Sequence, residues 1–195
     1  MKELFLLNLY EIAGNTELES LASRLIEGFS CPRNAEIESF LKNKALDFAR
    51  RKCSISYLVL DEKKRLLGYF TLTHKSLYVN AAQLSQTRKR RLRTFAGPDD
   101  GAGLFNVSAF LIAQLGRNFA IPPEEGIKGD ELLRMALTKL QEAQGIVGGG
   151  VVFLECEDEE KLLSFYQREP NCFIPIGERT ALSDGTKYWQ LLRFL

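Results

Sequence analysis

The sequence predicts an α/β protein in which a mixed central sheet is flanked by helices. Apolar residues repeat with a helical period in several segments, and β-branched and aromatic runs lie between those segments. A strand at 107–116, a helix at 130–144 and a strand at 148–156 follow one another directly. Such a unit requires a right-handed crossover between parallel strands. An antiparallel hairpin is predicted earlier in the chain, so the sheet should be mixed.

The N-terminal third predicts two helices. The first spans 16–29 and closes at Gly28, a residue type that commonly ends helices. The second spans 34–50, with Asn34 as its N-cap. Apolar side chains of the first helix fall on one face, which we expect to meet the core: Leu18, Leu21, Leu25 and Ile26.

A hairpin and a basic segment follow these helices. The runs 54–60 and 67–74 are β-branched and aromatic, and the polar turn DEKKR joins them. Residues 80–103 show no apolar periodicity and are expected to form a variable segment. Its cations are Arg88, Lys89, Arg90, Arg91 and Arg93.

The C-terminal half completes the predicted sheet. The helix at 130–144 should end at Gly145, and the next helix, 158–169, should be capped by Asp158. Two closing strands are predicted at 172–176 and 187–195. No repeat or low-complexity linker interrupts the chain, so residues 1–195 are expected to form one domain.

Composition excludes several chemistries. Lys and Arg number 26 against 25 Asp and Glu, so the net charge of +1 favours no class of partner. The one histidine, His74, excludes a multi-histidine metal site, and no metal is predicted. The cysteines lack a C-x-x-C spacing and fit a reducing compartment: Cys31, Cys53, Cys156 and Cys172. No run approaches the roughly 20 apolar residues of a membrane span, so we expect a cytoplasmic protein that does not bind membranes.

The junction 115–133 is the strongest candidate site. There a central strand leads through a glycine-containing loop into a helix N-terminus, which can offer N–H groups and a positive dipole end to a phosphate. Gly126 and Gly129 allow close backbone approach, and Lys128 adds a cation. Many such turns bind no ligand, so the residues alone leave both interpretations open.

The helix start Gly129-Asp-Glu-Leu-Leu, followed by a strand and a helix bearing Ser164-Phe165-Tyr166, resembles the GNAT acetyltransferase superfamily. The family pattern before the helix is R/Q-x-x-G-x-G/A. Here Glu124 stands at the Arg or Gln position and Ile127 at the first glycine, while Gly129 matches the second. The chain departs from the pattern at two of its three marked positions.

Within the superfamily the chain looks most similar to toxin-type members of bacterial toxin–antitoxin pairs. The similarity rests on four motifs in the correct order: the helix from Cys31 to Leu41, the basic end Arg50-Arg51, the strand from Gly68 to Leu72, and the closing strand from Tyr188 to Leu195.

This resemblance implies transfer of acetyl from acetyl-CoA to a primary amine. It places the pantetheine chain beside Leu115, Gly116 and Arg117. It places the pyrophosphate over Gly126, Ile127, Lys128, Gly129 and Asp130. Tyr166 matches the tyrosine that protonates the departing thiolate. The residue alone indicates a core aromatic, whereas the ordered family motifs favour the catalytic role. Glu155 and His74 are candidate bases, and neither is assigned.

The resemblance also suggests partners. Toxin-type members acetylate the amino group of aminoacyl-tRNA, a substrate that the run Arg88 to Arg93 would suit, although such a run can also be a solvated loop. An antitoxin is a further candidate partner. The apolar strand Trp189 to Leu195 would support a homodimer or simply close the sheet. Two alternatives remain: a protein or small-molecule amine as acceptor, and a non-catalytic protein that binds nucleic acid or a partner.

Overall fold

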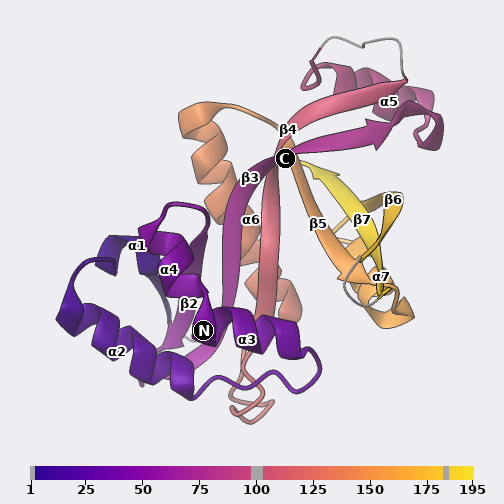
Figure 1. The fold of residues 1–195 in the computed structure, drawn as a ribbon. Helices are drawn as coiled ribbons and strands as arrows, with labels where there is room; N and C mark the ends of the chain where they lie inside the picture. The colour runs from indigo at the N-terminus through magenta and orange to yellow at the C-terminus, as the bar shows by residue number, and fades with distance from the viewer. Residues whose placement is uncertain (1–2, 98–102, 182–184) are drawn as a thin grey trace. The chain divides into compact units, whose positions relative to one another are not determined.

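The computed structural model describes residues 3–97, 103–181 and 185–195. Its seven strands form one sheet in the order β1-β2-β3-β4-β5-β7-β6 (Figure 1). β4 (Leu104–Arg117) and β5 (Val151–Glu157) are parallel and are joined through α6 (Gly129–Val147). The β1–β2, β2–β3, β5–β7 and β6–β7 pairs are antiparallel. The predicted mixed sheet flanked by helices is therefore confirmed.

The chain forms two compact units. Unit 1 comprises Met1–Thr73 and Ile112–Lys139, and unit 2 comprises His74–Leu111 and Leu140–Leu195. Three elements contribute residues to both units: β3 (Leu66–Asn80), β4 and α6.

Unit 1 contains an antiparallel edge of the sheet and four short helices, which gather beside these strands in Figure 1. Its core combines apolar side chains from the helices with Leu58, Leu66 and Tyr69 from the strands. The elements not yet introduced are β1 (Leu4–Asn8), α1 (Leu9–Ile12), α2 (Thr16–Glu27), α3 (Ala35–Asn43), α4 (Ala45–Arg50) and β2 (Ile55–Asp61).

The helices of unit 1 differ from the predicted ones in detail. Asn34 caps α3 as predicted, with its side chain accepting a hydrogen bond from the Ile37 N–H at 3.0 Å. The single helix expected over 34–50 is instead two, because the backbone leaves helical geometry at Lys44. In α2 the core-facing residues are Ala22 and Ile26. Leu18 and Leu21, expected in the core, are exposed by 43% and 49%.

An ion pair ties α2 to α4. The Arg50 guanidinium donates to both carboxylate oxygens of Glu19, and the Gly14 N–H donates to the same carboxylate at 2.8 Å. The hydrogen bond from Arg50, followed by that from Gly14, lowers the pKa of Glu19 to about 2. The carboxylate therefore remains ionised under ordinary conditions and joins two helices that are distant in sequence.

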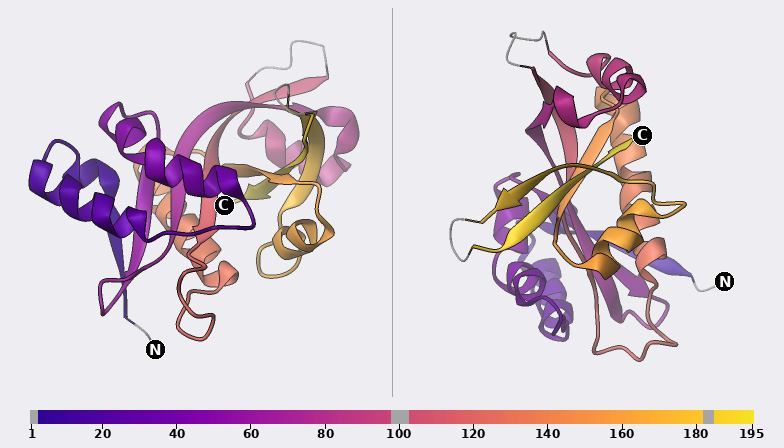
Figure 2. Two further views of the ribbon diagram at one scale, coloured as in Figure 1. Left: turned by 60° about the horizontal axis from the view of Figure 1, so that its bottom comes forward. Right: turned by 90° about the vertical axis from the view of Figure 1, so that its right-hand side faces the viewer.

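Unit 2 is built on strands that twist strongly past one another, as the right-hand view of Figure 2 shows for β6 and β7 beside α7. Its core includes Val107 and Ala109 of β4, Phe153 of β5 and Leu192 of β7. The elements not yet introduced are η1 (Ala81–Gln83), α5 (Gln86–Arg93), α7 (Glu160–Gln167), β6 (Ile174–Thr180) and β7 (Lys187–Phe194).

The basic segment contains regular structure that its sequence did not predict. Ser85 caps α5, and the buried Leu84 and Leu92 anchor it in the core of unit 2. Two apolar anchors are too few to create a periodic signal, which is why the helix was missed. Residues 98–102 of the segment lie outside the described part of the chain.

Two predicted helix ends are wrong. α6 continues through Gly145 to Val147, and the chain turns at Gly148, whose φ of +77° suits glycine. Asp158 does not cap α7, because the N-cap position falls at Glu159. The Asp158 carboxylate instead accepts a hydrogen bond from the Trp189 indole at 2.8 Å. All four cysteines are free thiols. Among the described residues, no helix has the length and hydropathy needed to cross a bilayer.

Candidate functional site

Close backbone packing fixes the end of β4 in unit 1. A Cβ atom on Gly68 of β3 would lie 2.8 Å from the carbonyl oxygen of Gly116. A Cβ atom on Gly116 would lie 2.5 Å from the Ile37 side chain. Neither position therefore has room for a side chain. Gly116 is buried, so this predicted cofactor contact is available only through its backbone.

Asn118 is the residue that holds this junction together, and sequence reasoning missed it. Its side-chain oxygen accepts hydrogen bonds from the N–H groups of Ser30 and Ala120, both at 3.0 Å. Its amide donates to the Leu66 carbonyl at 2.8 Å. The side chain is 6% exposed, so these bonds satisfy a buried polar group. A buried amide directly after a strand has no sequence signature, because only the tertiary contacts reveal it.

Arg117 is the last residue of β4 and directly precedes Asn118. Its guanidinium carbon lies 5.1 Å from the centre of the Phe119 ring. The guanidinium carbon of Arg33 also lies 5.1 Å from the centre of that ring. A guanidinium nitrogen of Arg117 also donates to the Ile127 carbonyl at 3.5 Å. The structure thus brings together two predicted contacts, Arg117 and Ile127, and places a second cation beside them.

The loop before α6 combines buried and exposed residues. Ile127 is 3% exposed, and its side chain packs against Gly68, so only its backbone can meet a ligand. Lys128 is exposed, and it forms no ion pair within the described ranges. Gly126 has space around its Cα, where an added Cβ would be 3.4 Å from the nearest atom, the Pro122 carbonyl oxygen. Asp130 lies in the first turn of α6. Its carboxylate there competes with a bound phosphate for the positive end of the helix dipole.

Arg65 neutralises one carboxylate of this loop. Its guanidinium pairs with Glu125 and, at 2.7 Å, with Asp61 at the end of β2. The pairing joins the turn between β2 and β3 to the loop before α6. Shared between two carboxylates, the guanidinium offsets part of the negative charge that they would otherwise present to a phosphate.

Tyr166 lies in unit 2, on α7. It is 8% exposed, and its ring packs edge-on against Phe165 at 4.9 Å and Phe173 at 5.8 Å between centroids. Burial, with the nearby Cys156 as a lesser cause, raises the pKa of its phenol well above the ordinary value. The phenol therefore keeps its proton at neutral pH.

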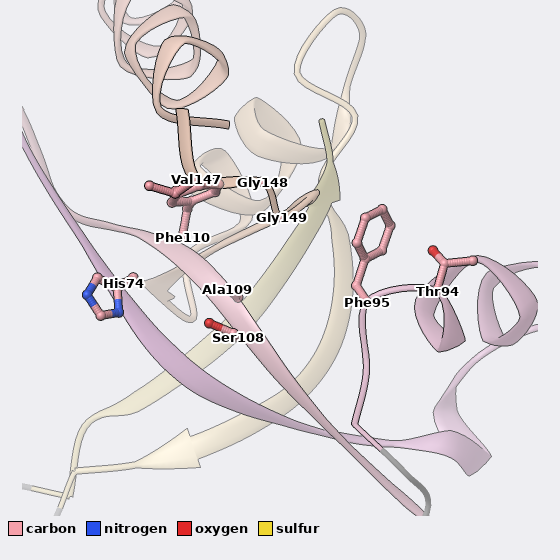
Figure 3. A pocket seen from close by; sticks show the side chains of 9 residues that line it. All are labelled: His74, Thr94, Phe95, Ser108, Ala109, Phe110, Val147, Gly148 and Gly149. Carbon is pink, nitrogen blue, oxygen red and sulfur yellow. The ribbon is translucent and has the colours of Figure 1, made fainter. Parts of the chain in front are cut away.

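The two candidate bases lie in different surroundings. Glu155 accepts hydrogen bonds from Arg179 at 2.7 Å and from Gln190 at 2.8 Å. His74 is exposed and lines a cavity of about 530 Å³ in unit 2, which is shown in Figure 3.

The five cations of α5 divide into two groups. Arg91 lies over the Phe194 ring at 4.3 Å, and Arg93 lies 5.9 Å from the centre of the Phe105 ring. These two side chains therefore cover core aromatics. Arg88, Lys89 and Arg90 form no ion pair in the part of the chain that the structure describes.

The fold is that of the GNAT acetyltransferases: a mixed seven-stranded sheet in which the parallel pair β4 and β5 is connected through a long helix. Neither the family models nor the curated proteins compared with the chain match its sequence.

Three solved structures illustrate the similarity. AtaT complexed with acetyl-methionyl-tRNAfMet has 18% identity and a TM-score of 0.62, covering 96% of this chain and 94% of that one. A tyrosine-to-phenylalanine mutant of KacT has 18% identity and a TM-score of 0.63, covering 96% and 95%. The third is a tyrosine-to-phenylalanine mutant of the toxin AtaT, bound to the C-terminus of the antitoxin AtaR and to acetyl-CoA. It has 17% identity and a TM-score of 0.57, covering 96% of this chain and 93% of that one. The resemblance to toxin-type GNAT proteins is confirmed at the level of fold.

Proposed function

We propose that the protein is an acetyl-CoA-dependent N-acetyltransferase whose acceptor is the amino group of an aminoacyl-tRNA. The observation that carries this proposal is the close likeness in fold to toxins whose structures contain acetyl-CoA or an acetylated aminoacyl-tRNA. At this level of identity the fold alone is shared, so the activity needs its own support from residues of this chain.

The loop and helix start in unit 1 have features that suit the cofactor. The first N–H groups of α6 have no acceptor within the helix, and Lys128 and Arg117 supply positive charge. The ion pair between Arg65 and Glu125 reduces the opposing charge. We assign the pyrophosphate to Gly126 through Asp130, and the pantetheine chain to the backbone of Leu115, Gly116 and Arg117.

Acetyl-CoA would supply an activated acetyl group as a thioester. The acceptor amine must arrive neutral, attack the carbonyl carbon and lose a proton, and the thiolate of CoA must gain one. We propose that the Tyr166 phenol donates the latter proton, because an O–H group positioned beside the sulfur can stabilise its developing negative charge and transfer a proton to it. We assign no protein base for the amine proton.

The remaining partners follow from the same proposal. Arg88, Lys89 and Arg90 would bind RNA phosphates, and Arg91 and Arg93 would contribute less because they cover aromatic rings. Since antitoxins accompany the similar toxins, we propose a protein inhibitor here too. Acetyl-CoA and charged tRNA both occur in the cytoplasm, which we propose as the location. A homodimer through Trp189 to Leu195 stays a prediction.

Calorimetric titration of acetyl-CoA into the protein tests the cofactor proposal. Gly129→Glu places a carboxylate at the proposed pyrophosphate site and should weaken acetyl-CoA binding at least tenfold, because it repels the phosphates. Gly145→Glu is the matched control, since that position lies on the same helix with no atom within 4 Å of an added Cβ. The control should bind like the wild type.

Absence of acetyl-CoA binding by folded wild-type protein would contradict the proposal. It would favour the alternative of a non-catalytic protein, for which Glu124 and the buried Ile127 at family glycine-loop positions argue.

A further inference from the structure

The cavity in unit 2 has the composition of a ligand site. It lies between β4, the end of α5 and the loop at 147–149, and its volume of about 530 Å³ is within the range of small-molecule pockets. Figure 3 shows the His74 imidazole and the Ser108 hydroxyl on neighbouring strands, with the rings of Phe95 and Phe110 nearer the glycine loop. The lining thus combines apolar walls with a few hydrogen-bonding groups.

The glycine run at 148–150 packs against the rings of Phe95 and Phe110. A Cβ atom on Gly150 would lie 2.2 Å from the Phe95 ring, and one on Gly149 would lie 3.3 Å from the Phe110 ring. Bare backbone therefore packs against both rings, and no side chain of this run fills the cavity. A site with aromatic walls, one imidazole and one hydroxyl suits a flat heteroaromatic ring, which stacks on its faces and hydrogen-bonds at its edge.

Positive charge lies next to the cavity. Thr94 lines it and follows Arg90 by four residues, so the two lie on one face at the end of α5. Arg90, with Arg88 and Lys89, forms no ion pair among the described residues. Arg88 and Lys89 lie on other faces of α5, so Arg90 is the cation on the cavity side. A flat ring beside an exposed cation is chemistry that suits a nucleotide with its phosphate.

We infer that this cavity binds an unpaired nucleobase of an RNA whose phosphates lie against α5. The inference rests on the proposed function for its choice of RNA, and it assigns a specific subsite for that substrate. Phe95 and Phe110 would stack on the base. His74 and Ser108 would hydrogen-bond its edge, which selects single-stranded RNA over a duplex, where bases are already stacked and paired.

A short single-stranded RNA carrying the fluorescent base 2-aminopurine tests this subsite, with no acetyl-CoA present. The wild-type protein should change the fluorescence on binding. Ser108→Phe, an exposed position on β4, fills the cavity and should weaken binding about 5- to 100-fold and abolish the fluorescence change. Asn106→Phe is the control, because that exposed residue lies two positions along the same strand and does not line the cavity. A blunt duplex of equal length should bind both variants alike.

His74→Ala provides a second variant should Ser108→Phe fail to fold, and it should weaken single-strand binding several-fold. Unchanged single-strand affinity and fluorescence in either folded variant would overturn the inference. So would a wild-type protein that binds no RNA, whatever peptide or protein it binds instead. Because acetyl-CoA is titrated separately, failure of the RNA subsite and failure of the cofactor proposal give different results.

Discussion

Tyr166 illustrates how one side chain can pack in the core and also serve chemistry. Its ring is held edge-on by two phenylalanines, so the position of the hydroxyl is fixed by packing. The same burial that raises its pKa also means that a phenylalanine would fit in its place. Only the proton-donating group distinguishes the two residues.

Tyr166→Phe should therefore lower kcat about 10²- to 10⁴-fold, the usual range for losing a positioned proton donor. Acetyl-CoA affinity and thermal stability should stay at wild-type values. Steady-state turnover, calorimetry and a melting curve separate these effects. Wild-type turnover in the variant would remove Tyr166 from the mechanism and leave it as a core aromatic.

At the same scale, the sequence predicted residues with a chemical signature and missed those defined by contacts. Tyr166 and Lys128 could be proposed as site residues because a family motif and a glycine-rich loop mark them, and their roles stay predictions. Asn118 and Arg65 could not, since one is recognised by its buried hydrogen bonds and the other by a partner 60 residues away.

At the scale of elements, the loop before α6 depends on the turn between β2 and β3. Arg65→Ala would remove the guanidinium that pairs with Glu125 beside the proposed pyrophosphate site. We expect acetyl-CoA affinity to fall several-fold at low salt, and less at high salt because ions screen the repulsion. Calorimetry at two salt concentrations measures the effect.

The double variant Arg65→Ala with Glu125→Gln serves as the control, because it removes the negative charge of Glu125 together with the positive charge of Arg65. It should recover most of the lost affinity. A double variant as weak as Arg65→Ala would show that Arg65 acts in some other way than by neutralising Glu125.

The elements themselves were predicted well where apolar periodicity is strong and poorly where it is weak. The crossover from β4 through α6 to β5 has continuous apolar strands and a clear helical stripe. By contrast, α5 is held by two buried leucines, and α1 has four residues, so neither contains enough apolar positions for a pattern to appear.

For the whole molecule, a net charge of +1 conceals a concentration of cations on α5. If Arg88, Lys89 and Arg90 each displace a counterion from RNA, replacing all three by alanine should reduce the slope of log Kd against log salt by about 2. Binding measured at several salt concentrations gives this slope. Replacing Arg24, Lys44 and Lys63, three exposed cations of unit 1, should leave it unchanged.

The chain passes between its two units three times, and this has a consequence for synthesis on the ribosome. Unit 1 needs residues up to Lys139, and unit 2 needs the C-terminal strand that ends near Leu195. Any premature stop codon before α6 leaves both units incomplete, and one after it spares only the first. A nascent chain therefore cannot complete unit 2, which contains Tyr166, until β7 has been translated, so the proposed acetyl transfer to charged tRNA would begin only after that point.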